Sequence, residues 1–271
     1  CRQSKQQEHT MGDVFSFQVQ SSFLSRQVKV DVYEKKATCP SSPVALLLIN
    51  DGQDLPSMGF ADVLEKHVHS FCRLICVGIH AGPDRKQEYG VAGIPDFMQR
   101  GASAGAYATF ILKELMPLLH QKTNAVKFDK KYLAGFSLGG LMAFDMAIDH
   151  PLEFSAVGVF SGSFWWRSKS LEDGYVEKRD RIMHAKVRKA AYHENRKFFL
   201  QVGALDEKED RNKNGIIDSI DDTLGIIGAL EVIGYRKGQD IHYLEMPDGR
   251  HNTATWGRAM PAFLGWLSDL K

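Results

Sequence analysis

The sequence predicts an α/β protein with a mostly parallel central sheet flanked by helices, because buried strands alternate with amphipathic helices along most of its length. Apolar runs of strand length are typical of strands covered on both faces, and they occur at 44–50, 73–79, 132–134, 156–160 and 198–202. Apolar residues at helical spacing occur at 107–120, 138–149, 223–233 and 260–270. This alternation predicts right-handed βαβ units around one sheet.

The first part of the chain has a different pattern and predicts antiparallel N-terminal strands. Residues 14–19 and 26–33 alternate apolar and polar side chains, as half-exposed strands do. No repeat, low-complexity tract or linker divides the remainder, and the charged segment 167–195 is expected on the surface of the same unit. We therefore predict a polar N-terminal tether at 1–13 and one domain at 14–271.

Composition excludes several classes of function. A chain of 271 residues with 44% hydrophobic and 25% charged residues has the composition of an ordinary globular domain with a sizeable core. The net charge of +1 and the lack of a Lys/Arg-rich stripe give no reason to expect nucleic acid as a partner. No apolar run approaches the roughly 18 residues of a membrane span. The sequence does not indicate an oligomeric state.

The four cysteines predict neither a disulfide framework nor a metal site. Cys72 and Cys76 lie in one predicted strand, with Cα atoms about 13 Å apart, too far for a disulfide. We expect both to be small core residues. Cys1 precedes a polar stretch, as the lipidated first residue of a processed bacterial lipoprotein does. That interpretation predicts a lipid anchor and a location in the cell envelope or periplasm; the alternative is that the sequence begins at this cysteine by chance.

The segment 135–140, Gly-Phe-Ser-Leu-Gly-Gly, lies between a predicted strand and a predicted helix. Its form, Gly-x-Ser-x-Gly, is that of the nucleophile elbow of α/β-hydrolases. Gly135 and Gly139 lack the Cβ atoms that would clash there, and Ser137 is expected in a strained conformation that projects its hydroxyl. The sequence thus predicts an α/β-hydrolase fold with Ser137 as nucleophile; an ordinary Gly/Ser turn is the alternative.

A serine hydroxyl needs a base, and that base needs an acid to orient it. In α/β-hydrolases the chain order is serine, acid, histidine, and the site lies at the carboxyl ends of the strands. Asp206 follows the run 198–202, and His251 follows a predicted strand at 241–246, so both fit this order. Glu207 and Asp210 are alternatives for the acid. In the non-catalytic alternative, Asp206 is an ordinary turn residue and His251 an ordinary surface residue.

Two backbone N–H groups are needed to stabilise the oxyanion of an acyl-transfer reaction. One is expected from Leu138, the residue after the nucleophile. The other is expected from Gln53, in the loop after 44–50, where Gly52 permits the turn. An ordinary glycine turn would have the same sequence.

Four separated motifs together resemble the Putative esterase family, the esterase D-like group of enterochelin, feruloyl and acetyl-xylan esterases, S-formylglutathione hydrolase and mycolyltransferases. They are 49–53, 135–140, 161–166, and 249–252 with Trp256. The resemblance covers roughly residues 15–270. It departs from the family in one place, since Asn50 precedes Asp51 where His-Gly or His-Asp-Gly is more usual.

This resemblance implies an α/β-hydrolase fold and carboxylic-ester hydrolysis by Ser137, Asp206 and His251. It also implies an oxyanion loop at Gly52-Gln53 and no cofactor for catalysis. The substrate class stays open among aryl, siderophore and acylated-carbohydrate esters.

Three side chains are candidates for contact with such a substrate. Trp165 and Trp166 follow the strand 156–160 and could line an acyl or aromatic-acid pocket, although paired tryptophans also cap hydrophobic cores. Arg85 lies on the loop after 73–79 and could meet a polar substrate, or it is simply solvated.

Residues 210–221 match the EF-hand calcium loop, with glycine at the sixth position for the sharp turn. The candidate ligands are Asp210, Asn212, Asn214, the carbonyl of Ile216, Asp218 and Asp221. The loop ends in Asp rather than Glu, as dockerin-type loops do. We predict a structural Ca²⁺ that rigidifies the acid loop; an Asn/Gly/Asp turn that binds nothing is the alternative.

These observations predict a serine carboxylic-ester hydrolase. One alternative is an acyltransferase on the same fold, which would pass the acyl group to an alcohol or sugar. Another is a non-catalytic, calcium-stabilised binding lipoprotein, which the intact Ser/Asp/His set disfavours.

Overall fold

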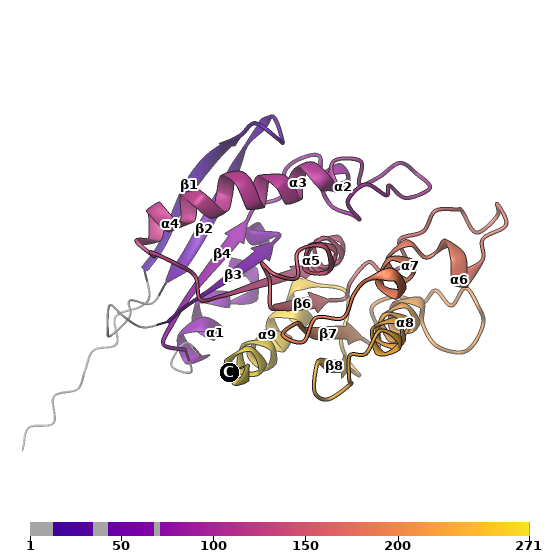
Figure 1. The fold of residues 1–271 in the computed structure, drawn as a ribbon. Coiled ribbons are helices and arrows are strands. Elements are labelled where there is room, and N and C mark those ends of the chain that lie inside the picture. Colours follow the sequence, from indigo (N-terminus) through magenta and orange to yellow (C-terminus); the bar gives the residue numbers. More distant parts are fainter. Residues whose placement is uncertain (1–12, 35–42, 68–70, 271) are drawn as a thin grey trace, which may run out of the picture.

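The computed structural model describes residues 13–34, 43–67 and 71–270, which form one eight-stranded sheet with helices on both faces (Figure 1). The strand order is β1-β2-β4-β3-β5-β6-β7-β8. β2 pairs antiparallel with both β1 and β4, whereas all other neighbouring strands are parallel. The predicted mostly parallel sheet with antiparallel N-terminal strands is therefore confirmed.

The strands are β1 (Asp13–Ser21), β2 (Arg26–Glu34), β3 (Val44–Asn50), β4 (Arg73–Ile79), β5 (Lys130–Phe136), β6 (Ala156–Phe160), β7 (Lys197–Gly203) and β8 (Ile241–Met246). The α-helices are α1 (Phe60–His67), α2 (Arg85–Glu88), α3 (Ala104–Phe110), α4 (Met116–Thr123), α5 (Leu138–Asp149), α6 (Glu177–Asp180), α7 (Ile182–Lys189), α8 (Asp218–Val232) and α9 (Thr253–Asp269). A π-helical turn, η4 (Ile111–Leu115), joins α3 to α4, and 3₁₀ turns η1 (Gly52–Asp54) and η2 (Pro56–Met58) follow β3.

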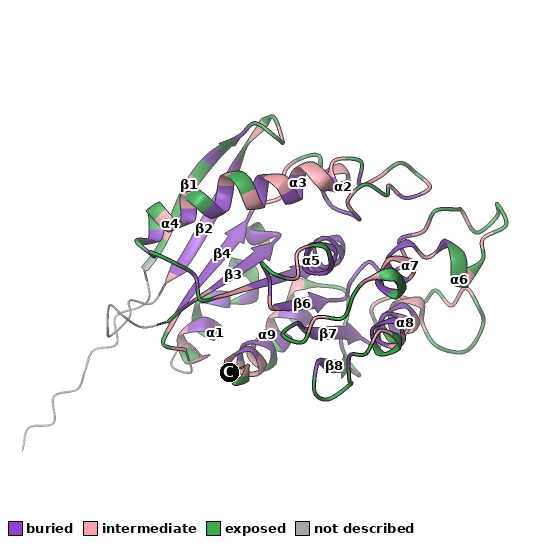
Figure 2. Cartoon of the chain, viewed as in Figure 1, coloured by how far each residue is buried: buried purple, intermediate pink, exposed green. Residues whose placement is uncertain are grey.

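Two hydrophobic cores lie on opposite faces of the sheet, because successive side chains of a strand point to opposite faces. On β3, Leu46 and Leu48 belong to the core under α3, α4, α5, α7 and α8. Leu47 and Ile49 belong to the core under α1 and α9. Figure 2 shows the central strands and α5 buried, whereas Lys178 and Arg179 in α6 are exposed. A parallel strand buried on both faces must be apolar throughout, which is why β3 reads as a continuous apolar run.

Some expectations differ from the structure. Cys72 is exposed, because β4 begins one residue later, whereas Cys76 is buried as expected. Helices α1 and α7 were not predicted; each has only eight residues, and its buried apolar side chains, such as Phe60 and Leu64 of α1, extend over little more than two turns. Cys1 and most of the predicted tether lie outside the described residues, so that prediction stays untested. Within the ranges described, no helix is long and apolar enough to cross a membrane.

Candidate active site

The turn between β5 and α5 is too tight for ordinary residues. A Cβ atom on Gly135 would lie 2.2 Å from the carbonyl oxygen of Gly139, so strand and helix can approach this closely only through glycine. Ser137 has φ 54° and ψ −121°, a conformation that non-glycine residues rarely adopt. Its N–H donates to the carbonyl of Phe160 at 2.9 Å, which fixes the turn to the end of β6. The expected strained serine is therefore present.

A second serine, Ser163, lies beside Ser137; it belongs to the motif 161–166 but was not among the predicted site residues. The two hydroxyl oxygens of Ser137 and Ser163 are 3.4 Å apart, and the Ser163 N–H donates to the Ser137 carbonyl at 3.1 Å. Ser163 is buried, whereas Ser137 is partly exposed. The segment Ser161-Gly162-Ser163 directly follows β6, so a polar cluster at the end of a buried strand was the available signal.

Asp206 lies just after β7, where its carboxylate accepts the Gly203 N–H at 3.1 Å through Oδ2. Its other oxygen, Oδ1, is buried and has no hydrogen-bond partner among the residues that the structure describes. Burial raises the pKa of Asp206, and the Ser161 hydroxyl, the Gly203 amide and the charge of His251 act in the opposite direction. The carboxylate is thus desolvated and has acceptor capacity to spare.

His251 lies on the loop between β8 and α9, with its ring edge-to-face against Trp256 at a centroid distance of 5.3 Å. Desolvation lowers the pKa of His251; Asp206 raises it and the positive charge of Arg85 lowers it further. In the part of the chain described, no hydrogen bond joins the His251 ring to Ser137 or to Asp206. Catalytic hydrogen bonds are often long without substrate and tighten when it binds, so this geometry leaves the pairing available.

The loops that carry Asp206 and His251 touch backbone to backbone. The Leu205 N–H donates to the Gly249 carbonyl at 2.8 Å, and a Cβ on Gly203 would lie 2.5 Å from the Gly249 carbonyl carbon. Trp256 adds a second connection, since its indole N–H donates to the Ser161 hydroxyl at 3.0 Å. The carboxyl ends of β5 to β8 therefore converge on one place, as the order of the parallel strands requires.

The alternative acids face elsewhere. Glu207 accepts the Ser219 N–H at 2.5 Å, at the start of α8. Asp210 accepts the N–H groups of Asn214 and Gly215 at 3.1 and 2.9 Å, inside its own loop. Of the three acidic candidates, only Asp206 acts on the pKa of His251.

The two expected oxyanion donors lie at the ends of β3 and β5. Leu138 is the first residue of α5, where backbone N–H groups have no partner within the helix. Gln53 lies in η1, where its side chain bridges the Asp51 carboxylate at 3.2 Å and the Ala81 N–H at 3.0 Å. Asp51 itself is buried, with φ 60°. Side-chain hydrogen bonds of Gln53 and Asp51 thus hold this loop in place. An ordinary glycine turn would not require such contacts.

Arg85 fixes the same loop. Its guanidinium forms a two-pronged ion pair with the Asp51 carboxylate, at 2.7 and 2.8 Å, over the ring of Tyr89. The Arg85 side chain remains 31% exposed against 1% for Asp51, so part of the guanidinium still faces solvent. Arg85 therefore anchors the predicted oxyanion loop, in addition to any contact with substrate.

The two tryptophans differ. Trp166 has no exposed surface, and its indole N–H donates to the Ile94 carbonyl at 3.3 Å. The structure thus places Trp166 in the hydrophobic core, where it cannot line a substrate pocket. Trp165 is partly exposed, with the Arg100 guanidinium 4.9 Å from its ring centroid. The two tryptophans thus differ in burial, a difference that the sequence could not predict.

The predicted calcium loop does not gather all its candidate ligands. The side-chain amides of Asn212 and Asn214 donate to the Asp221 carboxylate at 3.0 and 3.4 Å. Asp218 is directed away, because its carboxylate accepts the Arg211 N–H at 2.9 Å and pairs with the Arg211 guanidinium at 3.3 Å. Ile216 is 39% exposed. Across the described ranges, no group of three or more His, Cys, Asp or Glu side chains could hold a metal ion.

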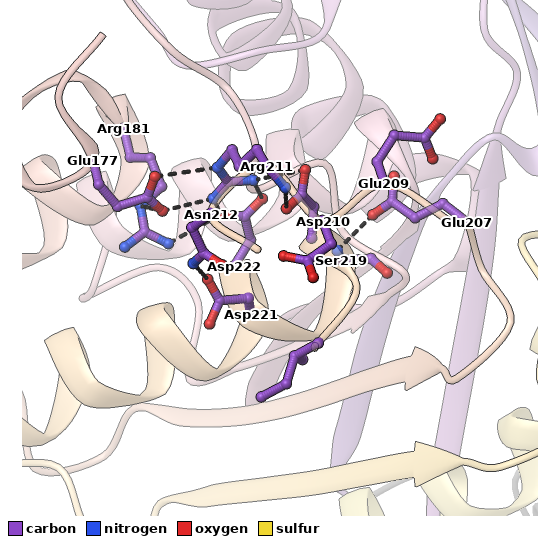
Figure 3. Close-up of polar contacts among 12 residues, drawn as sticks. Glu177, Arg181, Glu207, Glu209, Asp210, Arg211, Asn212, Ser219, Asp221 and Asp222 are labelled. Atoms are coloured by element: carbon purple, nitrogen blue, oxygen red, sulfur yellow. Dashed lines mark hydrogen bonds and ion pairs between the residues drawn. The ribbon is translucent and has the colours of Figure 1, made fainter. Parts of the chain in front are cut away.

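Arg211 is the centre of a charged network that the sequence did not predict (Figure 3). Its guanidinium contacts Glu177 at 2.7 Å and Asp222 at 3.0 Å, and Arg181 contacts the same two carboxylates at 3.1 and 3.0 Å. The side chains of Arg211 and Asp222 are only 7% and 1% exposed. This network ties the loop after β7 to α6 and α8.

Comparisons with known proteins agree with this architecture. The family model described as Putative esterase matches residues 21–267. The enterobactin esterase FES from Shigella flexneri superposes with a TM-score of 0.67 at 20% identity, over 95% of this chain and 59% of that chain. A ferulic acid esterase superposes with a TM-score of 0.67 at 18% identity, over 96% and 99%. The siderophore hydrolase EstB from Aspergillus nidulans superposes with a TM-score of 0.64 at 18% identity, over 92% of this chain and 93% of that chain.

No curated protein sequence matches the chain. At 18–20% identity, the structural matches show the fold, which confirms the predicted α/β-hydrolase architecture. The chain spans 59% of the length of the first enterobactin esterase, so that protein is considerably longer.

Proposed function

The chain belongs to the Putative esterase family, and from that premise we propose that it is a carboxylic ester hydrolase in which Ser137, His251 and Asp206 carry out the hydrolysis. The observation that carries this proposal is the strained conformation of Ser137 at the carboxyl end of β5, the same edge of the sheet at which the loops after β7 and β8 touch each other. A strained serine between a strand and a buried helix is costly, and such strain is typical of functional sites.

His251 takes the proton of the Ser137 hydroxyl as the serine oxygen attacks the ester carbonyl, and it returns that proton to the leaving alcohol. A water molecule then attacks the acyl-enzyme with His251 again as base; the bond between the Ser137 oxygen and the acyl carbon breaks, the carboxylic acid leaves, and His251 returns the proton to the Ser137 oxygen. Asp206 orients the ring and balances the charge of the imidazolium. Its unpartnered Oδ1 is the acceptor available for the His251 ring N–H.

The electrostatics favour this assignment. The lowered pKa of His251 keeps its imidazole neutral at neutral pH, so that it can accept a proton. The N–H groups of Leu138 and Gln53 are proposed to bind the developing oxyanion, supported by the positive end of α5. Asp51 and Arg85 hold the Gln53 loop in place.

We propose an ester with an aromatic acyl group as the substrate class. The partly exposed ring of Trp165, after β6, could stack on such a group, and Arg85 presents a positive charge to a polar substituent. Similar structures include esterases of enterobactin and of ferulic acid, according to their names. Comparing methyl ferulate with acetylated xylan tests this choice, and Trp165→Ala should reduce kcat/KM for the aryl ester alone.

The experiment for the proposed function is hydrolysis of p-nitrophenyl acetate by the wild type and Ser137→Ala. We expect kcat to fall roughly 10⁴- to 10⁶-fold in the variant, because the attacking group is lost. Ser155→Ala is a matched control, since Ser155 precedes β6 at the opposite end of the sheet. Equal rates for Ser137→Ala and the wild type would refute the assignment. Faster product formation with an added alcohol acceptor would indicate an acyltransferase.

A structural calcium ion in the loop 210–221 is a separate proposal. The side chains of Asn212 and Asn214 contact Asp221, and the side-chain oxygens of Asp210 and Asn212 accept the Asn214 N–H. Gly215 has φ 86° at the sharp turn. These four side chains offer oxygen donors of the kind calcium prefers, together with the Ile216 carbonyl, while Asp218 stays with Arg211. Calcium should raise the Tm of the wild type and not of Asp221→Asn; an unchanged wild-type Tm would refute the ion.

A further inference from the structure

A cavity of about 640 Å³ is lined by residues of the C-terminal end of α5, of helix α7 and of the segment before β7. Figure 1 shows where α5, α7 and β7 lie. The volume of the cavity is in the range of small-molecule sites. Much of its wall is apolar and includes Ile94, Ile148, Pro151 and Ala185. No part of the mechanism proposed above uses it.

One wall of this cavity is the side chain of Arg196, a residue that is only 1% exposed. Its Nε and Nη1 atoms are buried and have no hydrogen-bond partner among the described residues. Burial lowers the pKa of this guanidinium, and the nearby Tyr235 and Asp149 raise it only in part. An unpaired buried charge is expensive for a folded protein, and such groups are normally paired.

None of the other described charged side chains around the cavity forms a hydrogen bond with the Nε or Nη1 atom of Arg196. Lys186 contacts Asp145 at 2.6 Å and Asp149 at 2.7 Å, so these three charges are engaged with one another. Arg179 is paired with Asp180 at 2.8 Å. Lys189, at the exposed end of α7, forms no ion pair within the described part of the chain.

The cavity is distinct from the proposed catalytic centre. Ile148 and Asp149, which line it, are at the end of α5, whereas Leu138 at the start of this 12-residue helix follows the nucleophile. A helix of that length separates its two ends by roughly 16 Å. A ligand here would not contact Ser137.

We propose that this cavity binds a small organic carboxylate with an apolar body. The carboxylate would supply the counter-charge that Arg196 lacks, since guanidinium groups pair with carboxylates by charge-assisted hydrogen bonds. The apolar body would cover the isoleucine, alanine and proline side chains of the wall. A monoanion fits, because Lys186 and Arg179 are already neutralised. This binding site is independent of the proposed esterase activity.

Calorimetric titration with sodium benzoate tests the proposal on the full chain. We expect saturable binding to the wild type and a loss of affinity of roughly tenfold or more in Arg196→Met. Arg188→Met is the matched control. Arg188 lies in α7, which forms part of the cavity wall, but its side chain is exposed and does not line the cavity. Benzamide, the neutral analogue of benzoate, should bind much more weakly than benzoate.

Arg196→Met should fold, because replacing a buried unpaired charge with an apolar side chain of similar size is often neutral or stabilising. Ala185→Phe is a second variant, which fills the cavity without changing its charge and should also abolish benzoate binding. Equal benzoate affinity in Arg196→Met and the wild type, or no binding to the wild type, would overturn the proposal. Inorganic phosphate binding as tightly as benzoate would overturn the requirement for an apolar body.

Discussion

The nucleophile elbow, residues 135–140, and the acid loop, residues 203–218, are held in place by different forces. The elbow is fixed by backbone contact: Gly135 and Gly139 allow β5 and α5 to touch, and almost every residue of α5 is buried. The acid loop is fixed by charge, through the contacts of Arg211 with Glu177 and Asp222 (Figure 3). Steric constraints do not depend on pH, whereas ion pairs do.

This difference has a consequence for the proposed site. Ser137 should keep its position over a wide range of pH and salt, because close packing sets it. Asp206 should be more sensitive, since the loop that continues from it is anchored by carboxylates and arginines. The elbow and the acid loop can therefore be weakened separately.

The largest effect is expected from Gly135→Ala. The added Cβ would lie 2.2 Å from the Gly139 carbonyl oxygen, so the strand and the helix would have to separate. We expect a loss of more than about 3 kcal/mol in the free energy of unfolding, or no folded protein. Gly105→Ala is the control, because a Cβ at Gly105 in α3 meets nothing within 4 Å. Equal stability of the two variants in urea unfolding would contradict a steric origin for the elbow.

A smaller loss is expected from Arg211→Met, which leaves the buried Asp222 with one arginine instead of two. We expect a cost of about 3 kcal/mol at neutral pH. Burial raises the pKa of Asp222 and Arg211 lowers it, so its ionised form becomes costlier in the variant. A carboxyl group whose pKa is raised in the folded state destabilises the fold as pH rises. The difference in the free energy of unfolding between Arg211→Met and the wild type should therefore become smaller at acidic pH.

Arg258→Met is the control for this prediction. Arg258 pairs with Asp248 at 2.6 Å, but both side chains are more than half exposed, at 51% and 69%. Such exposed pairs contribute little to stability, because solvent and salt screen them. If the difference in the free energy of unfolding between Arg211→Met and the wild type does not change with pH, charge does not anchor the acid loop.

The smallest effect concerns the pH dependence of activity. His251 must be neutral to act as a base, and Arg85 lowers its pKa. In Arg85→Met the pKa of His251 should rise, so the acid limb of the kcat/KM profile should move to higher pH. Arg85→Lys retains the charge and should keep the limb close to its original position, even if kcat falls. If the acid limb of the kcat/KM profile does not move in Arg85→Met, the charge of Arg85 does not affect the pKa of His251.

The sequence predicted the elbow and the mostly parallel sheet well because their signals are local. The apolar run of β3 and the two glycines around Ser137 are required by the backbone itself. What it could not predict depends on contacts between distant segments. Trp165 and Trp166 are neighbours, and only tertiary packing decides that Trp166 is buried.

The acid loop shows the same limit. The spacing of residues 210–221 matches a calcium loop, but Arg211 within that spacing takes Asp218 as its partner. Its other partners, Glu177 and Asp222, come from α6 and α8, so no local pattern could reveal the network. The hydroxyl of Ser161 likewise meets Trp256 across 95 residues of sequence.

The central claim is that Ser137 is the nucleophile, and covalent trapping tests it most directly. A fluorophosphonate ester should form one adduct per chain, and peptide mass spectrometry should locate it on Ser137. Ser137→Ala should remain unlabelled, and an excess of p-nitrophenyl acetate should slow labelling of the wild type. An adduct on Ser163, whose hydroxyl oxygen is 3.4 Å from that of Ser137, or no adduct at all, would contradict the account.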